Sequence, residues 1–262
     1  MLESPHISLI IPAWNEALYL PRLLDSVVAA RARYRAGAGA IEVLVADNVS
    51  TDETARVAAA HDCRVVQVEK RVIGAVRNGG AAVARGAILS FIDADCTIHP
   101  ETFNAVSAAF GDHRLMASMT GLRFDRWSPG IAATYALTVP LAWITGLDAG
   151  VMSCRQGDFQ AIGGYNEDRL FAEDVQILID LRRLGRSRGQ RMRRLRGVKA
   201  VTSTRKFDRH GDWHMFAMMA RAPLALFRRN AVRDTALEYW YQDRISPPSG
   251  PAEGAPAPPN AR

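Results

Sequence analysis

Residues 7–16 read ISLIIPAWNE, an apolar run that stops at a proline and gives way to polar side chains. The apolar part, residues 7–11, has the length and unbroken character of a strand that is buried on both faces. Similar runs follow at 41–46, 64–68 and 88–92, separated by helical patterns at 16–34, 51–61 and 74–85. Strands that alternate with helices in this way predict an α/β fold with a mostly parallel sheet flanked by helices.

Each of these predicted strands ends in polar or acidic residues. The strand ends carry Trp14-Asn15-Glu16, Asp47-Asn48, Glu69-Lys70-Arg71 and Asp93-Ala94-Asp95. A single acid after a strand is commonly only a helix cap, but ligands of such sheets bind beyond the carboxyl ends of the strands. Four strand ends in series therefore indicate a binding site. Neither a G-x-G-x-x-G after the first strand nor a Walker A loop is present, which excludes the usual nicotinamide and ATP sites.

Asp93 and Asp95 flank Ala94 where the fourth strand ends. If the chain is extended there, carboxylates at positions i and i+2 point the same way and can face one ligand. Hard divalent cations that hold diphosphates bind carboxylate oxygens, and the phosphates complete the coordination shell. The pair therefore predicts a Mn²⁺ or Mg²⁺ site, where the cation would offset charge on a departing diphosphate.

Several stretches together resemble the successive motifs of the family 2 glycosyltransferases. They are 7–16 (ISLIIPAWNE), 45–54 (VADNVSTDET), 76–80 (VRNGG), 91–95 (FIDAD), 163–165 (GGY) and 172–175 (AEDV). The resemblance covers residues 5–210 approximately and implies a GT-A fold in one domain, 1–244. Its nucleotide-binding half would lie at about 1–96 and its acceptor-binding half at about 97–244. The Pro- and Ala-rich composition of 245–262 predicts a disordered tail.

The resemblance implies an inverting, hexosyltransferase-type enzyme that uses a nucleotide diphosphate-sugar, with a UDP-sugar as the expected donor. It assigns Pro12, Glu16 and Asp47 to the nucleotide pocket, where Asp47 would accept a hydrogen bond from the base. Ala46 and Asn48 depart from the family's usual paired aspartates and glycine, so the identity of the base stays open.

For the transferred group, the resemblance assigns Arg77 to the diphosphate or the sugar. It assigns Asp93 to the ribose or the donor sugar, and Asp95 to the Mn²⁺ or Mg²⁺ ion. The expected acceptor is a saccharide, a lipid-linked carrier or a small molecule, and the sequence does not choose among them.

Glu173 and Asp174 open a predicted helix that continues VQILIDLRRLG. Acids in a first turn interact favourably with the helix dipole and need no further role. The resemblance implies that Asp174 is the general base that takes the proton of the acceptor hydroxyl, with Glu173 as the alternative. A single base opposite the leaving group implies one in-line displacement and hence inversion.

A strongly basic block lies between residues 182 and 209, where twelve Lys or Arg accompany one acid. The block has a net charge of +11. Since the whole chain has a net charge of +6, the rest of the chain carries −5. Within it, the resemblance suggests that Arg205 and Lys206 contact phosphate and that His210 is a metal ligand, although a lone His is more often structural. Aromatic residues are not interleaved through the block, so nucleic acid is not an expected partner.

Cys63, Cys96 and Cys154 fit neither a disulfide framework nor a zinc site and indicate a reducing compartment. With no signal peptide or transmembrane helix expected, the predicted location is the cytoplasm. The run at 214–229 has Met and aromatic residues at helical spacing with flanking arginines. It predicts either core packing or peripheral contact with the inner face of the plasma membrane.

Two other functions are compatible with parts of the pattern. A noncatalytic module could keep the nucleotide-sugar fold, but retention of Asp47, Asp95 and Asp174 argues against it. A nucleotidyltransferase should carry a Gly- and Arg/Lys-rich loop after the first strand, and PAWNEALYL offers none.

Overall fold

The computed structural model describes residues 5–145, 148–169 and 172–216, and all structural statements below concern these residues. They lie within one compact unit, residues 1–221. The predicted tail at 245–262 and most of the run at 214–229 fall outside the described residues. No helix in the described ranges is long and apolar enough to cross a membrane.

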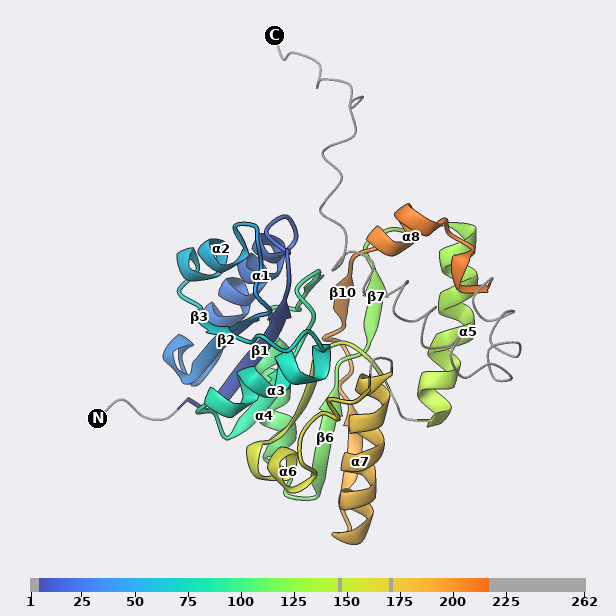
Figure 1. Cartoon of the computed structure of the whole chain (residues 1–262). Coiled ribbons are helices and arrows are strands. Elements are labelled where there is room, and N and C mark those ends of the chain that lie inside the picture. The colour runs from blue at the N-terminus through green and yellow to red at the C-terminus, as the bar shows by residue number, and fades with distance from the viewer. Residues whose placement is uncertain (1–4, 146–147, 170–171, 217–262) are drawn as a thin grey trace. The chain divides into compact units, whose positions relative to one another are not determined.

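A seven-stranded sheet forms the centre of this unit (Figure 1). Its strands, in spatial order, are β3 (Arg64–Gln67), β2 (Ile41–Asp47), β1 (Ile7–Ala13), β4 (Ile88–Phe91), β8 (Met152–Arg155), β6 (Leu115–Met119) and β9 (Arg191–Arg194). The first four run parallel, and β8 is antiparallel to both of its neighbours. A smaller sheet contains β5 (Cys96–Thr97), β10 (Ala200–Thr202) and β7 (Leu122–Phe124). The predicted α/β fold with a mostly parallel sheet is confirmed.

Helices connect and cover these strands. They are α1 (Leu20–Ala32), η1 (Ala38–Ala40), α2 (Thr54–Ala60), α3 (Ile73–Val83), α4 (Thr102–Phe110), α5 (Pro129–Thr145), α6 (Gln156–Ala161), α7 (Glu173–Ser187) and α8 (Arg205–His210). The predicted helices at 16–34, 51–61 and 74–85 correspond to α1, α2 and α3. The first two are shorter than predicted because their flanking residues form turns, and α3 begins one residue earlier than predicted and ends two residues earlier.

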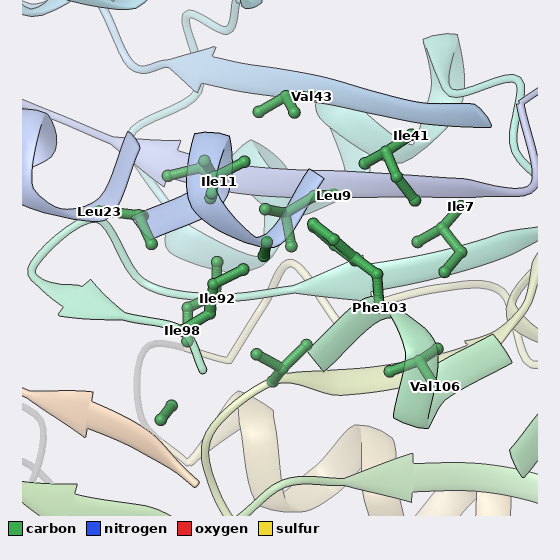
Figure 2. Close-up of a cluster of buried hydrophobic side chains, with 14 of the residues drawn as sticks. Ile7, Leu9, Ile11, Leu23, Ile41, Val43, Ile92, Ile98, Phe103 and Val106 are labelled. Atoms are coloured by element: carbon green, nitrogen blue, oxygen red, sulfur yellow. The ribbon is translucent and has the colours of Figure 1, made fainter. Parts of the chain in front are cut away.

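The apolar run in β1 is continuous because both faces of the strand are buried. Ile7, Leu9 and Ile11 belong to one core cluster with α1 and α4, while Ile10 belongs to a second cluster with α3, α6 and α7. Figure 2 draws the first cluster, in which Phe103 of α4 lies beside Ile7 and Leu9. A strand with an apolar core on each side must lie inside a covered sheet, as its sequence predicted.

Pro12 does not end the first strand, contrary to the sequence prediction, because β1 continues to Ala13. The Ile10 carbonyl accepts from Ile92 N, whereas the Ala13 carbonyl accepts from Asn48 N. Since alternate residues face opposite neighbours, Pro12 faces the side of β4, where pairing ends at Ile10. Its missing N–H therefore lies beyond the end of that ladder, and the ring is tolerated inside the sheet.

Gly80 allows α3 to lie close against β1 and β2. A Cβ at this position would come 2.6 Å from Ile10 Cγ2 and 3.4 Å from Ala46 Cβ. Glycine inside a helix normally costs stability, so its presence here is explained by the close approach. This packing places the neighbouring residues of α3, including Arg77, near the carboxyl ends of the parallel strands.

Candidate functional site

Asp47, at the end of β2, is buried and hydrogen-bonded to neighbouring polar side chains. Its side chain accepts hydrogen bonds from Ser50 Oγ and, at 2.7 Å, from Gln67 Nε2, and the residue is only 2% exposed. The next residue, Asn48, donates through Nδ2 to the Val68 carbonyl at 2.6 Å. Among the described residues Asn48 Oδ1 has no partner although it is buried. Two acceptor side chains, Asp47 and Asn48, thus lie next to each other at the end of β2.

Three charged residues from distant parts of the chain, Glu16, Arg205 and Asp95, form a cluster at the edge of the sheet. Arg205 binds both Glu16 oxygens at 2.7 Å, its Nε lies 3.0 Å from Asp95 Oδ2, and its guanidinium lies over the Tyr19 ring at 4.8 Å. Burial raises the pKa of both Glu16 and Asp95 above its ordinary value, although the Arg205 charge opposes this. The cluster thus holds two carboxylates around a single guanidinium.

Lys206 follows Arg205 in α8. Burial lowers the pKa of Lys206 to about 8, although the nearby charges of Asp95 and Asp93 oppose this shift. Near neutral pH its ammonium therefore remains largely charged, beside the same carboxylates. The two consecutive basic residues predicted from the sequence thus both reach the acidic edge of the sheet.

Arg77 joins two other predicted site residues. Its guanidinium, with only 8% of the side chain exposed, donates to Asp93 Oδ1 at 2.8 Å and to Glu173 Oε1 at 2.7 Å. It also lies 5.1 Å from the centre of the Tyr165 ring. Burial would raise the pKa of Asp93, but the Arg77 charge lowers it below its ordinary value. The FIDAD, VRNGG, GGY and AEDV motifs therefore meet at one arginine.

The segment 93–95 is a turn rather than an extended chain, so the sequence argument for two parallel carboxylates is wrong. Cys96 N donates to the Asp93 carbonyl at 3.1 Å, which closes the turn between β4 and β5. Asp93 is consequently paired with Arg77, whereas Asp95 is paired with Arg205. The two carboxylates still lie near enough for the Asp93 charge to raise the pKa of Asp95.

Glu173 and Asp174 differ in their surroundings. The Glu173 side chain is 12% exposed and held by Arg77, whereas Asp174 is an exposed residue. Desolvation and the Glu173 charge raise the pKa of Asp174 above 3.8. The residue before them, Ala172, has a left-handed φ of 55°. Such a conformation costs a non-glycine residue about 1–2 kcal/mol, and strain of this kind is often found where a site requires it.

The His210 ring lies 5.8 Å from that of His214, at the end of α8. In the described ranges no group of three or more His, Cys, Asp or Glu side chains is placed to hold a metal ion. The assignment of His210 as a metal ligand therefore stays a prediction.

Sequence comparison matches the first half of the chain to a known family. A sequence model of glycosyl transferase family 2 matches residues 8–131. The glycosyltransferase AglE of Haloferax volcanii is 36% identical over 106 residues, which cover 37% of this chain and 33% of the relative. A validoxylamine A glucosyltransferase of Streptomyces hygroscopicus is 32% identical over 111 residues, 40% of this chain and 25% of the relative. The matched part thus spans a third or less of these relatives.

Solved structures identify the fold. Staphylococcus aureus TarS 1-349 in complex with UDP superposes with a TM-score of 0.57 at 20% identity, covering 76% of this chain and 60% of that one. The mannosyltransferase PcManGT of Pyrobaculum calidifontis, in complex with GDP-Man and Mn²⁺, gives 0.58 at 21% identity, covering 76% and 56%. The resemblance found in the sequence is therefore confirmed: residues 8–131 match the family 2 glycosyltransferases, and the chain has the GT-A fold.

Proposed function

We propose that this chain transfers a hexose from a nucleoside diphosphate-sugar to an acceptor hydroxyl, with inversion at the anomeric carbon. The observation that carries the proposal is the convergence of Glu16, Asp95, Asp93 and Glu173 with Arg77 and Arg205 at the carboxyl ends of β1 and β4. The family match and the fold support the same reaction class. Related folds bind UDP in one case and GDP-Man in another, so both bases belong in the donor test.

Asp47 and Asn48 form the proposed site of the nucleobase. Asp47 and the unpartnered Asn48 Oδ1 could both accept from a base N–H, and hydrogen-bonding a buried acceptor removes a desolvation penalty of about 1–3 kcal/mol. Pro12 lies in β1 next to Ala46 of β2 and so borders the same site. Arg205 and Lys206 are the proposed partners of the diphosphate.

The residues present fit a divalent cation bound jointly with the donor. Asp95, with Asp93 nearby, offers the hard oxygen ligands that Mn²⁺ and Mg²⁺ prefer, and fewer than three protein ligands are usual where phosphates complete the shell. Two of the related structures, PcManGT and a mycobacterial glucosyl-3-phosphoglycerate synthase, contain Mn²⁺. When bound, the cation would supply positive charge at the departing diphosphate.

Asp174 is the proposed general base. Glu173 is held by Arg77 through a 2.7 Å ion pair, which occupies its carboxylate. Asp174 is an exposed residue, and its raised pKa suits a proton acceptor. The acceptor oxygen would attack the anomeric carbon as its proton passes to Asp174, and the bond from that carbon to the diphosphate oxygen would break on the opposite face.

Release of nucleoside diphosphate from UDP-, GDP- and dTDP-sugars, with Mn²⁺, Mg²⁺ or EDTA, tests the proposal. We expect one donor to be hydrolysed slowly in a metal-dependent reaction, with at least about a hundredfold loss in Asp174→Asn and in Asp95→Ala. The control Asp180→Asn changes a carboxylate of the same helix that binds Gln176 and Arg183, and it should retain activity.

Each other outcome of this experiment has a definite meaning. Full activity in Asp174→Asn would exclude Asp174 as the base. A product with retained anomeric configuration would exclude the single displacement. Calorimetric donor binding without hydrolysis would indicate that the acceptor is required, whereas no binding to any donor would favour a noncatalytic module.

A further inference from the structure

Arg205 lies between the carboxylates of Glu16 and Asp95. The sequence resemblance assigns Glu16 to nucleotide binding, and the proposed function assigns Asp95 to the divalent cation. Glu16 follows β1, Asp95 lies in the turn after β4, and Arg205 begins α8. The three side chains nevertheless meet through contacts of 2.7, 2.7 and 3.0 Å. Glu16 and Asp95 are 12% and 13% exposed, so they are shielded from most solvent counter-ions. Their negative charge is instead balanced by a cation that belongs to the chain.

The backbone around Arg205 is fixed independently of its guanidinium. Ser203 N donates to the Asp95 carbonyl at 3.2 Å, and Thr204, which is 3% exposed, donates through N and Oγ1 to Asp125 Oδ1 at 3.1 and 2.9 Å. These bonds hold the start of α8 against the 93–95 turn. The Arg205 side chain, 32% exposed, can therefore change partners by rotating its own bonds while α8 stays in place.

We propose that Arg205 and a divalent cation are alternative counter-ions of Asp95, and that Arg205 turns from Asp95 to the donor diphosphate when donor and cation bind together. This inference rests on the proposed function for its choice of donor. The physical reason is that a guanidinium 3.0 Å from a carboxylate oxygen repels a second cation at that oxygen and blocks its approach. A diphosphate offers the guanidinium new oxygen partners.

Two consequences follow for binding. The cation alone should bind weakly, because it must separate Arg205 from Asp95 without giving Arg205 another partner. The cation and a nucleoside diphosphate should bind cooperatively, because the diphosphate accepts the arginine that the cation displaces. By linkage, the increase in affinity is the same whichever of the two binds first.

Binding of Mn²⁺ alone to the full chain, followed by electron paramagnetic resonance and by calorimetry, tests the inference without turnover. Arg205→Gln removes the competing cation, and we expect the Kd for Mn²⁺ to fall about two- to fivefold. Arg205→Lys should give an intermediate value, because it keeps the charge but loses the fork that holds Glu16. The cooperativity between Mn²⁺ and UDP or GDP should be lost in Arg205→Gln.

Arg22→Gln is the matched control, because it removes one positive charge from a 57% exposed side chain that pairs with Asp125. An Arg205→Gln variant whose Kd for Mn²⁺ equals or exceeds that of Arg22→Gln would overturn the inference, provided that circular dichroism shows both variants folded. If Arg205→Gln does not fold, Arg205→Lys decides by the same comparison. If Arg205→Gln binds Mn²⁺ more tightly than Arg22→Gln but the wild type hydrolyses no donor, the inference is supported and the proposed reaction is not. The failure of the inference can therefore be told apart from the failure of the proposed function.

Discussion

Arg77 links the turn after β4 to the start of α7, because Asp93 and Glu173 both depend on its guanidinium. Arg77→Gln would leave Glu173 buried without a counter-ion. We expect a loss of about 2–3 kcal/mol in the free energy of unfolding, below the usual cost of breaking a buried pair because the Asp93 side chain is 55% exposed. Urea denaturation at pH 7 measures this loss. Arg77→Lys should recover part of it, and equal stability of Arg77→Gln and the wild type would contradict the prediction.

Glu42 gives a prediction for pH dependence. Its carboxylate, 5% exposed, accepts from Ser8 Oγ at 2.6 Å and from Arg85 N and Nε at 2.9 Å. Burial alone would raise its pKa, but these bonds lower it below the ordinary 4.5. A lowered pKa in the folded state stabilises the fold above the unfolded value, and this contribution is lost as the pH falls through the folded value.

Glu42→Gln should therefore cost about 1–3 kcal/mol near neutral pH. The difference in unfolding free energy between the variant and the wild type should stay constant from pH 8 to pH 6 and shrink below about pH 4.5. Urea denaturation of both proteins across this range measures the difference. If this difference in unfolding free energy instead increases as the pH falls, Glu42 is not held in its ionised form.

The sequence predicted which candidate residues share one edge of the sheet but not which side chains they contact. Glu16, Asp47, Asp93 and Asp95 could be placed together because the carboxyl ends of parallel strands share one edge of a sheet. The partner of Glu16, however, is Arg205, 189 positions away along the chain. Such a contact depends on how α8 returns to the sheet, and local periodicity carries no information about that. The unpartnered oxygen of Asn48 could not be predicted for a related reason, since it is visible only in the folded structure.

At the scale of secondary structure, the packing of α3 on β1 and β2 depends on Gly80. Gly80→Ala would place a Cβ against Ile10, a stiff β-branched residue with no exposed surface. We expect destabilisation of about 1–3 kcal/mol from overpacking, partly offset by the better helix propensity of alanine. Gly39→Ala is the control, because a Cβ there meets nothing within 4 Å. Thermal unfolding compares the two, and equal melting temperatures would contradict the close packing.

The sequence predicted the elements of the first ninety residues well and those of the later half less well. The strands at 41–46, 64–68 and 88–92 agree with β2, β3 and β4 to within one residue at each end. Their runs are strongly apolar because both faces of the sheet are covered. By contrast, β8 reads MSCR, and its Ser153 is buried in the sheet through a 2.8 Å hydrogen bond to Ser90. A strand stabilised by such a cross-strand polar pair leaves no apolar pattern to detect.

For the molecule as a whole, the basic block at 182–209 is partly neutralised by acids elsewhere in the chain. At least six of its arginines form ion pairs with acids outside the block: Arg183, Arg188, Arg191, Arg193, Arg194 and Arg205. Their partners include Asp112, Asp148 and Asp158. The −5 carried by the rest of the sequence is thus partly the counterpart of this block.

Binding to nucleic acid should accordingly be weak. We expect a 20-base-pair duplex to bind at physiological salt no more tightly than the nonspecific range of about 10⁻⁴–10⁻⁶ M. Fluorescence anisotropy of a labelled duplex between 50 and 200 mM salt measures the affinity. Nanomolar binding that falls steeply with salt would instead mean that the arginines leave their carboxylates for phosphate.

The four residues of β8 also determine where the chain can be cut. β8 lies between β4 and β6 and pairs with both, yet it comes after residue 131, where the family match ends. A fragment that stops there would contain β4 and β6 but not the strand that pairs with both of them. Two unprotected strand edges are a template for aggregation, so we expect such a truncation to precipitate rather than to act as a separate nucleotide-binding module. Any minimal version of this protein for expression would have to extend at least through β9.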